Sequence, residues 1–353
     1  MEYNTRLMEK EDIDDILRIY RGTAGITHDR ASFEWQYISN PARKGTEPQI
    51  VAEEIDSGEI VGFILSTPWK LRWGAKAYHA TIGSDAFVDS NHRKRGLYNR
   101  MAEFMLSRDT SALGEVRIIF YNVNIKNAST SSADGFETSI SLYLSNPKRV
   151  AEAVYDIKAG RAMSSLYSAL RNANSARRTR ENVELRQTDI GSIQDVYEKW
   201  RQHNELIHTD RSIEYLRWRF LEDPTKRHDL HTVIHNGEEA GYVVSSVSEA
   251  FGEYALRTAI ISDYIIKGDD PDVFEAATRQ IVESYDDVDV IMARAFATPS
   301  YQERLRRIGF LESLRFPLSH WIRPGFFALR IFNEDFRNAA VRDEWYLTQS
   351  DCF

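Results

Sequence analysis

The sequence contains almost no cysteine and no long apolar run. Only one of its 353 residues, Cys352, is a cysteine, so neither a disulfide framework nor a thiolate metal site can form. A reducing, cytoplasmic compartment is therefore expected. The N-terminal stretch MEYNTRLMEKED has no apolar signal core, and no segment approaches the ~20 consecutive apolar residues that span a bilayer. We expect a soluble protein with no membrane partner.

An excess of positive charge is also absent. The net charge is −8 at pH 7, from 45 Lys and Arg residues against 53 Asp and Glu residues. A chain with this balance has no general attraction to a nucleic acid backbone, so we expect no nucleic acid partner. The length of 353 residues corresponds to two domains of roughly 150 residues each, and the 42% hydrophobic content is sufficient for two cores.

What the sequence does contain is a repeat. DRASFEWQYISNPARK, from Asp29, and DRSIEYLRWRFLEDPTKR, from Asp210, share a Trp, an aromatic residue two places later, and a Pro before basic residues. Three further pairs of segments follow in the same order: IVAEEIDSGEIVGFILS with TVIHNGEEAGYVVSS, ATIGSDAFV with TAIISDYII, and GFE with GFL. Chance can produce any one of these matches, but four in the same order favour an internal duplication. The alignment pairs Trp35 with Trp218, Tyr37 with Phe220, and Asp85 with Asp263.

One copy of the repeat interleaves helical and extended patterns, which predicts an α/β protein with a mixed, α+β sheet packed by helices. The predicted helices are 12–20, 31–38 and 96–107, and the predicted strands are 5–8, 49–55, 60–70, 78–88 and 116–121, with a last strand after Gly135. The polar stretch RNANSARRTREN favours a solvated linker over a partner-binding patch. The expected division is a first domain at 1–147, a helical and basic linker at 148–183, a second domain at 184–324 and a C-terminal tail at 325–353.

The most unusual local feature is the basic segment VDSNHRKRGLYNRM, residues 88–101, in an otherwise acidic chain. A predicted strand ends at Val88, and apolar residues recur at helical spacing from Leu97, so the segment is a strand, a turn and a helix. The first N–H groups of a helix have no partners within it and carry the positive end of its dipole, so a diphosphate fits there. The turn adds three cationic side chains and a glycine that allows close backbone approach: Arg93, Lys94, Arg95 and Gly96.

This segment resembles the acyl-CoA loop of the GNAT superfamily of N-acyltransferases, in which a strand ending in Val precedes R/Q-x-x-G-x-G/A. Val88, Arg93 and Gly96 match that pattern, whereas Tyr98 stands where the family has a small residue. The order of predicted elements also agrees with the family over the first copy, and over the second copy by way of the repeat. The resemblance implies an α/β protein built from two tandem GNAT-like acyl-CoA N-acyltransferase folds.

The resemblance also implies the substrates. Acetyl-CoA would be the co-substrate, no metal would be needed, and the acceptor would be a small-molecule amine such as an amino sugar or an amino-acid derivative. The pantetheine arm would lie beside the backbone of the fourth strand, where the sheet splays. The residues expected to bind acetyl-CoA are Phe87, Val88, Arg93, Lys94, Arg95, Gly96, Leu97, Tyr98 and Asn124.

Transfer to an amine needs a proton acceptor for the amine and a proton donor for the departing thiolate. Asp85, three residues before Val88, is the candidate base. A cap or ion-pair role is the alternative, because Asp263 repeats Asp85 in a copy expected to be inactive. The family's thiolate-protonating Tyr would fall near Ser131, so the candidate acids are Ser131, Tyr121 and water.

The second copy lacks the basic turn. It has KGDDPDVFEA after its strand, and Asp269, Asp270 and Asp272 complement the helix dipole themselves and repel a diphosphate. Pro271 removes one amide that could face a phosphate. We therefore expect one acetyl-CoA per chain, bound by the first copy.

Three functions remain open on this basis. The leading one is a tandem GNAT N-acetyltransferase. The alternatives are a Fem-type aminoacyl-tRNA-dependent peptidyl transferase, against which the basic turn argues, and a non-catalytic acyl-CoA-binding sensor. Five aromatic residues could wall an acceptor pocket, although aromatic residues at such spacing are more often core: Trp35, Tyr37, Trp69, Trp73 and Tyr78. His28 and His208 hold related places in the repeat and are expected to be structural.

Overall fold

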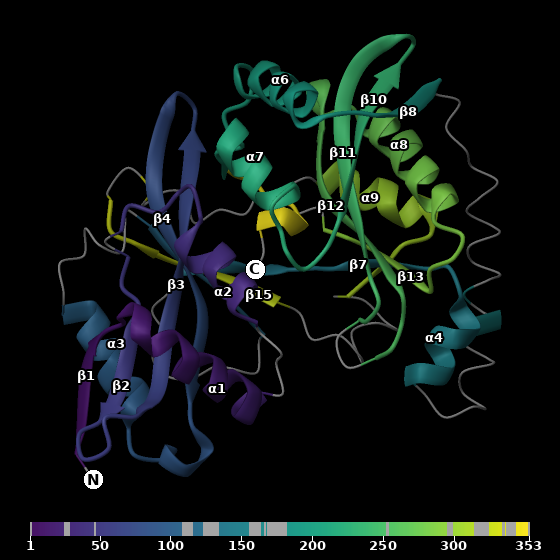
Figure 1. The fold of residues 1–353 in the computed structure, drawn as a ribbon. Helices are drawn as coiled ribbons and strands as arrows, with labels where there is room; N and C mark the ends of the chain where they lie inside the picture. The colour runs from purple at the N-terminus through teal and green to yellow at the C-terminus, as the bar shows by residue number, and fades with distance from the viewer. Residues whose placement is uncertain are drawn as a thin grey trace.

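The computed structural model (Figure 1) consists of two mixed sheets, each packed by helices, which confirms the α/β class. It describes residues 2–24, 29–45, 47–107, 116–122, 134–154, 164, 165, 167, 182–251, 254–294, 299–313, 325–333, 336 and 344–351. Within these residues, no helix has the length and apolar character needed to cross a membrane.

The first sheet has the strand order β1-β2-β3-β4-β5-β15-β6, with β9 beside β3 and β16 beside β9. Its strands are β1 (Tyr3–Leu7), β2 (Ile50–Glu54), β3 (Ile60–Trp73), β4 (Lys76–Val88), β5 (Val116–Asn122), β6 (Asp134–Thr138), β9 (Ile207–Thr209), β15 (Gly325–Ile331) and β16 (Trp345–Tyr346). The helical segments beside it are η1 (Lys10–Asp12), α1 (Ile13–Ala24), α2 (Arg30–Phe33), the π-helical turn η2 (Glu34–Ile38), η3 (Ser90–His92) and α3 (Leu97–Ser107).

Helices cover both faces of this sheet. Leu65 of β3 packs in a cluster with Ile16 and Tyr20 of α1, whereas Ile64 packs in a separate cluster with Met101 of α3. Consecutive residues of a strand point to opposite faces, so α1 and α3 lie on opposite sides of β3. The alternating apolar residues of β3 therefore form two cores.

The second sheet has the order β14-β7-β13-β12-β11-β10-β8. Its strands are β7 (Ser141–Leu144), β8 (Val183–Gln187), β10 (His228–His235), β11 (Glu238–Ser248), β12 (Thr258–Ile266), β13 (Val290–Ala293) and β14 (Leu311–Glu312). The remaining helical segments are α4 (Pro147–Val154), α6 (Ile190–Arg201), α7 (Ile213–Phe220), η6 (Lys267–Asp269), α8 (Pro271–Ser284), α9 (Pro299–Ile308) and η10 (Gln349–Asp351).

The repeated segments occupy equivalent places in the two sheets. Gly62 pairs with Val88 across β3 and β4, and Gly241 pairs with Ile266 across β11 and β12. Both hairpins also carry a register shift a few residues further on, at the level of Ile64 to Ser66 and of Val244 to Ser245. A bulge of this kind bends its strand and re-aims the neighbouring side chains.

Strands are exchanged between the two halves, and β7 and β15 are the clearest cases. β7 pairs with β13 and β14 in the second sheet, and β15 pairs with β5 and β6 in the first. Residues 325–331, placed in a C-terminal tail by the sequence analysis, are thus a strand between two strands of the first half. The domain division stays a prediction, but no single cut between 147 and 184 separates the two sheets.

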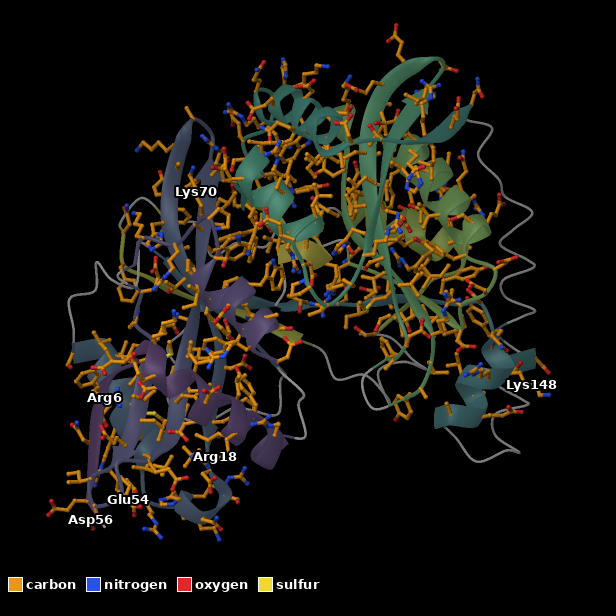
Figure 2. The ribbon with its side chains drawn as sticks, viewed as in Figure 1. Arg6, Arg18, Glu54, Asp56, Lys70 and Lys148 are labelled. Carbon is orange, nitrogen blue, oxygen red and sulfur yellow. The ribbon has the colours of Figure 1, made fainter. Side chains whose placement is uncertain are left out.

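The two halves meet through residues that are counterparts in the repeat. The rings of Trp35 and Trp218 stack with centroids 4.8 Å apart, and each Nε1–H donates to the other residue's carbonyl oxygen at 2.9 Å. These contacts are reciprocal, as they would be across a two-fold axis. Ion pairs add to the contact, since Lys70, labelled in Figure 2, and Arg72 of β3 bind Asp210 at 2.6 and 2.7 Å.

Candidate active site where β4 leaves β5

β4 and β5 separate half-way along β4. Parallel pairing runs from Ala80 opposite Val116 to Gly83 opposite Ile119, and β4 then continues to Val88. Among the described residues nothing pairs with that side of β4 beyond Gly83. The backbone N–H and C=O groups of an unpaired strand edge can hydrogen-bond an extended ligand. Phe87, expected beside the pantetheine arm, lies on this open stretch.

The basic turn follows directly and lies on the surface. Arg93, Lys94, Arg95 and Gly96 are all exposed. Gly96 has φ of 74°, and a Cβ built there would meet nothing within 4 Å, so the left-handed backbone conformation rather than lack of space favours glycine. Lys94, with φ of 62°, adopts the same conformation without being glycine. The two residues turn the chain from β4 into α3.

Contacts within the turn orient its arginines. Arg93 Nε donates to the carbonyl of Val88 at 3.2 Å, and Arg95 donates to the Tyr3 hydroxyl at 2.7 Å. Leu97 is buried against the sheet and anchors the start of α3, whereas Tyr98 is 47% exposed. The larger residue at position 98 therefore turns away from the core and fits this backbone without displacing α3.

The start of α8 in the second half contrasts with that of α3. The Asp270 carboxylate accepts from the backbone N–H groups of Asp272 and Val273 at 2.9 and 3.2 Å. The place of an external anion is thus taken by a side chain of the chain itself. Asp272 in addition binds Arg304 at 2.9 Å.

The opening between β12 and β13 is bridged as well. These strands pair from Thr258 to Ile261, and β12 then continues to Ile266 paired only with β11 among the described residues. The Tyr264 hydroxyl donates to the carbonyl of Arg294 at 2.9 Å, and the hydroxyl of Tyr346, from β16, donates to the carbonyl of Tyr264. The C-terminal segment thus contacts the strand edge that, in the first half, lies open.

Asp85 lies two residues beyond Gly83, on the open stretch of β4. Its Oδ2 accepts hydrogen bonds from the hydroxyls of Tyr20 and Tyr37, both at 2.8 Å. Burial, reinforced by the negative charge of Asp85, raises the pKa of Tyr20 above its usual value. The pKa of Tyr37 is raised in the same way, by burial first. Both hydroxyls therefore stay protonated donors, and Asp85 is half-buried between them.

The partners of Asp85 cannot be recognised from the sequence. The sequence offers Tyr37 only as one of five aromatic residues that could wall a pocket, and it gives no sign of a role for Tyr20. Each stands in an amphipathic helical pattern in which a tyrosine ring fits a core position, so no local signal distinguishes its hydroxyl. Only the position of Tyr37 in the repeat offers a hint, because Phe220 has the ring without the hydroxyl.

The candidate proton donors Ser131 and Tyr121, and Asn124, which is expected to contact acetyl-CoA, are placed less fully. Ser131 and Asn124 lie outside the described residues. The backbone of Tyr121 is on β5, two residues beyond Ile119, where pairing with β4 ends. Tyr121 therefore lies on the part of β5 that is no longer paired with β4.

The other aromatic candidates are mostly structural. Trp69 is 1% exposed and donates to Thr209 Oγ1 at 2.9 Å, and Trp35 stacks on Trp218. Trp73 and Tyr78 line a shallow cavity of about 480 Å³ with Gly74, Ala75, Lys76 and Glu205. This cavity lies at the β3–β4 hairpin turn, at the opposite end of β4 from Val88. The described residues contain no cluster of three or more His, Cys, Asp or Glu side chains that could hold a metal ion.

Comparison with known proteins connects this geometry to a fold. No family model matches the sequence, and no curated protein is similar to it in sequence. The structure resembles a GCN5-related N-acetyltransferase from Anabaena variabilis, with a TM-score of 0.61 and 9% identity over 94% of this chain and 73% of that one. It also resembles Saccharomyces cerevisiae N-myristoyltransferase with bound myristoyl-CoA, with a TM-score of 0.59 and 14% identity over 93% and 78% of the two chains.

A third solved structure agrees. Eis1 from Mycobacterium abscessus matches with a TM-score of 0.54 and 14% identity over 96% of this chain and 76% of that one. At these identities the likeness establishes the fold, and the chain has the fold of the GNAT acyltransferases.

Proposed function

We propose that this protein is an N-acyltransferase that transfers an acyl group from acyl-CoA, acetyl-CoA in the first instance, to the amine of a small molecule such as an amino sugar or an amino-acid derivative. One observation carries the proposal: the open edge of β4 beyond Gly83 runs directly into the exposed basic turn before α3. An edge suited to an extended amide-containing arm thus adjoins a turn suited to a diphosphate. The bound myristoyl-CoA in a protein of the same fold supports acyl-CoA as the donor.

Different residues of the first half are proposed to bind different parts of acyl-CoA. The turn from Arg93 to Gly96 and the first amides of α3 bind the diphosphate, and the backbone around Phe87 and Val88 binds the pantetheine arm. This holds the thioester carbonyl near the point where β4 leaves β5. Asn124 is proposed to add a contact from the end of β5.

The chemical step needs one base and one acid. Asp85 takes a proton from the acceptor ammonium group, directly or through a water molecule, and the amine nitrogen attacks the thioester carbonyl carbon. The new C–N bond forms as the C–S bond breaks, and the nitrogen then loses its second proton, which replaces the one given to the sulfur. The departing sulfur receives a proton from Tyr121, Ser131 or water, and the products are an amide and free CoA.

The second half is proposed to bind no acyl-CoA. Asp270 occupies the start of α8, and Tyr264 and Tyr346 bridge the opening between β12 and β13. The helix start and the strand opening that are proposed to bind acyl-CoA in the first half are thus both occupied by side chains in the second half. One acyl-CoA per chain is expected, with the second half supporting the first.

A non-catalytic acyl-CoA sensor is the second candidate. It is favoured by one observation, that the position near Ser131 lacks the tyrosine that would protonate the thiolate. Such a sensor would use the same turn and strand edge, so binding alone does not separate the two functions. Release of free thiol separates them, because only the enzyme cleaves the thioester.

The test combines calorimetry with a thiol-release assay. Acetyl-CoA and myristoyl-CoA are titrated into the protein, and thiol release is then followed with a panel of primary amines. We expect one site per chain. Arg93→Ala should weaken binding about tenfold to a hundredfold, since a charge-assisted phosphate contact contributes about 1.5–3 kcal/mol.

Two further variants sharpen the result. Arg186→Ala removes an exposed arginine that pairs only with Glu184 among the described residues, and it should leave binding unchanged. Asp85→Asn should lower kcat by about a hundredfold or more with unchanged acetyl-CoA affinity, because a base acts in the transition state. Binding without thiol release for any amine would support the sensor, and absence of binding would refute both functions.

A further inference from the structure

We propose that Tyr20 and Tyr37 are positioning residues, which hold Asp85 as a carboxylate with one oxygen engaged and the other free to meet the acceptor amine. The inference rests on the proposed function, because it assigns the surroundings of the proposed base. It starts from the way in which the two hydroxyls are shared. Both donate to the same oxygen, Oδ2, from different elements: Tyr20 from α1 and Tyr37 from η2.

The hydrogen-bond chain behind Tyr37 sets the direction of its hydroxyl proton. Gln36 Nε2 donates to the Tyr37 hydroxyl oxygen and to Thr67 Oγ1, both at 3.2 Å. An amide nitrogen is only a donor, so the Tyr37 oxygen accepts there and its own proton is left for Asp85. Thr67 in turn shares a hydrogen bond with Ser84, the neighbour of Asp85 on β4, at 2.5 Å. This series of hydrogen bonds therefore fixes the orientation of the Tyr37 hydroxyl.

The other oxygen of Asp85 has a different environment. Among the described residues, Oδ1 accepts no hydrogen bond, and no Lys, Arg or His forms an ion pair with Asp85. The titratable groups in contact with the carboxylate are thus the two tyrosines, which stay neutral. A carboxylate that accepts two hydrogen bonds at one oxygen is stabilised in its charged form and retains lone pairs at the other. Such a group can receive a proton from an ammonium ion.

The second half shows what a purely structural aspartate looks like at the same place. Asp263 is fully buried, and both of its oxygens are engaged. Arg211 Nε and the Tyr242 hydroxyl donate to Oδ2 at 2.9 and 2.8 Å. Arg211 and Thr348 donate to Oδ1 at 2.9 and 2.7 Å. No oxygen is left for a substrate.

The tyrosines themselves also differ between the halves. Phe220, the counterpart of Tyr37, has no hydroxyl. Tyr197 stands at the same place in α6 as Tyr20 does in α1, but its hydroxyl contacts His208 at 3.2 Å and Asp210 at 3.3 Å. Among the described residues, two tyrosine hydroxyls share one oxygen of the aspartate only in the half that has the basic turn and the open strand edge, since Asp263 accepts from a single tyrosine. This difference between the halves is expected if the two tyrosine hydroxyls position Asp85 for catalysis. It has no explanation if the tyrosines only pack in the core.

The experiment measures the pH profile of kcat/KM for thiol release in the parent protein, in Tyr20→Phe, in Tyr37→Phe and in the double variant. Each substitution keeps the buried ring and removes one donor to Asp85. Losing a hydrogen bond to a charged group should move the acidic limb of the profile upward by about one pH unit, and by more in the double variant. Acetyl-CoA affinity should not change.

Tyr197→Phe is the matched control, because it removes the corresponding hydroxyl from the second half. It should leave the pH profile in place, and thermal unfolding checks that all variants fold. An active parent with an unmoved profile in the double variant overturns this inference alone. A parent that releases no thiol with any amine refutes the proposed catalysis, and the assignment of the tyrosines falls with it.

Discussion

At the scale of single residues, Arg211 shows how strongly one buried charge depends on its partners. Its side chain is fully buried and binds Asp263 at 2.9 Å and Asp351 at 3.2 Å. Burial acts to lower the pKa of Arg211, but the two carboxylates outweigh it and raise the pKa well above the usual value. The guanidinium thus joins β12 to the C-terminal segment.

Replacing this arginine should be costly. Arg211→Met leaves two buried carboxylates facing each other without a cation, and we expect a loss of about 3–5 kcal/mol in the free energy of unfolding. Urea denaturation at pH 7 measures it. Arg30→Met is the matched control, since Arg30 is the counterpart in the repeat but pairs with Asp14 at the surface, and no measurable loss is expected there. Equal stability of the two variants would contradict the role assigned to Arg211.

At the scale of elements, the short strand β9 links the halves. It comes from the second copy but pairs with β3 through Leu71 and Arg72, and with β16 on its other side. Its central residue, His208, is fully buried. One ring nitrogen contacts the carbonyl of Leu206 at 2.8 Å and the other contacts the Tyr197 hydroxyl. Burial lowers the pKa of His208 to about 4.

The buried histidine makes a pH prediction with a definite sign. Below pH 6.5 the unfolded chain binds a proton at His208 that the folded chain does not bind until about pH 4. Stability is therefore complete above pH 6.5 and falls between pH 6.5 and about 4, by about 3 kcal/mol from this residue. Urea denaturation at several pH values in parent and His208→Phe isolates the contribution, because other groups cancel in the difference. Parallel pH curves in the two proteins would count against it.

At the scale of the whole molecule, the two halves are joined by exchanged strands as well as by surface contacts. β7 lies in the second sheet although its residues precede α4, and β15 lies in the first sheet although it follows the second copy. Neither sheet can be completed without a strand from the other end of the chain. Stacking of Trp35 on Trp218 adds a reciprocal contact between the copies.

This exchange predicts a single unfolding transition. Far-ultraviolet circular dichroism and tryptophan fluorescence should give superimposable urea curves, since losing either sheet removes strands that the other needs. Trp218→Ala should lower the midpoint, because a buried Trp to Ala change costs about 3–5 kcal/mol, but it should not split the transition. Two separate transitions in the parent protein would mean that the halves are independent domains.

Much of the first half follows from local patterns. Alternating apolar residues predicted the strands 60–70 and 78–88, and the structure has them as β3 and β4 with ends shifted by a few residues. The turn before α3 was predicted from Gly96 and the recurrence of apolar residues after Leu97. The acidic residues of the second copy predict that it binds no diphosphate, which stays a prediction, and the structure shows that Asp270 caps α8. In each case the cause is contained in a short segment.

Pairing between distant segments could not be predicted in this way. Residues 325–331 have a strand pattern, but nothing in that pattern specifies β5 and β6 as neighbours rather than the strands of their own copy. The same holds for Tyr20 and Tyr37, whose hydroxyls meet Asp85 from positions 65 and 48 residues away in the chain. Periodicity reports which face of an element is apolar, whereas the partner of that face depends on the packing of the whole chain. The local elements and the basic turn are therefore properties of the sequence, and the exchanged strands and the surroundings of Asp85 are properties of the folded molecule.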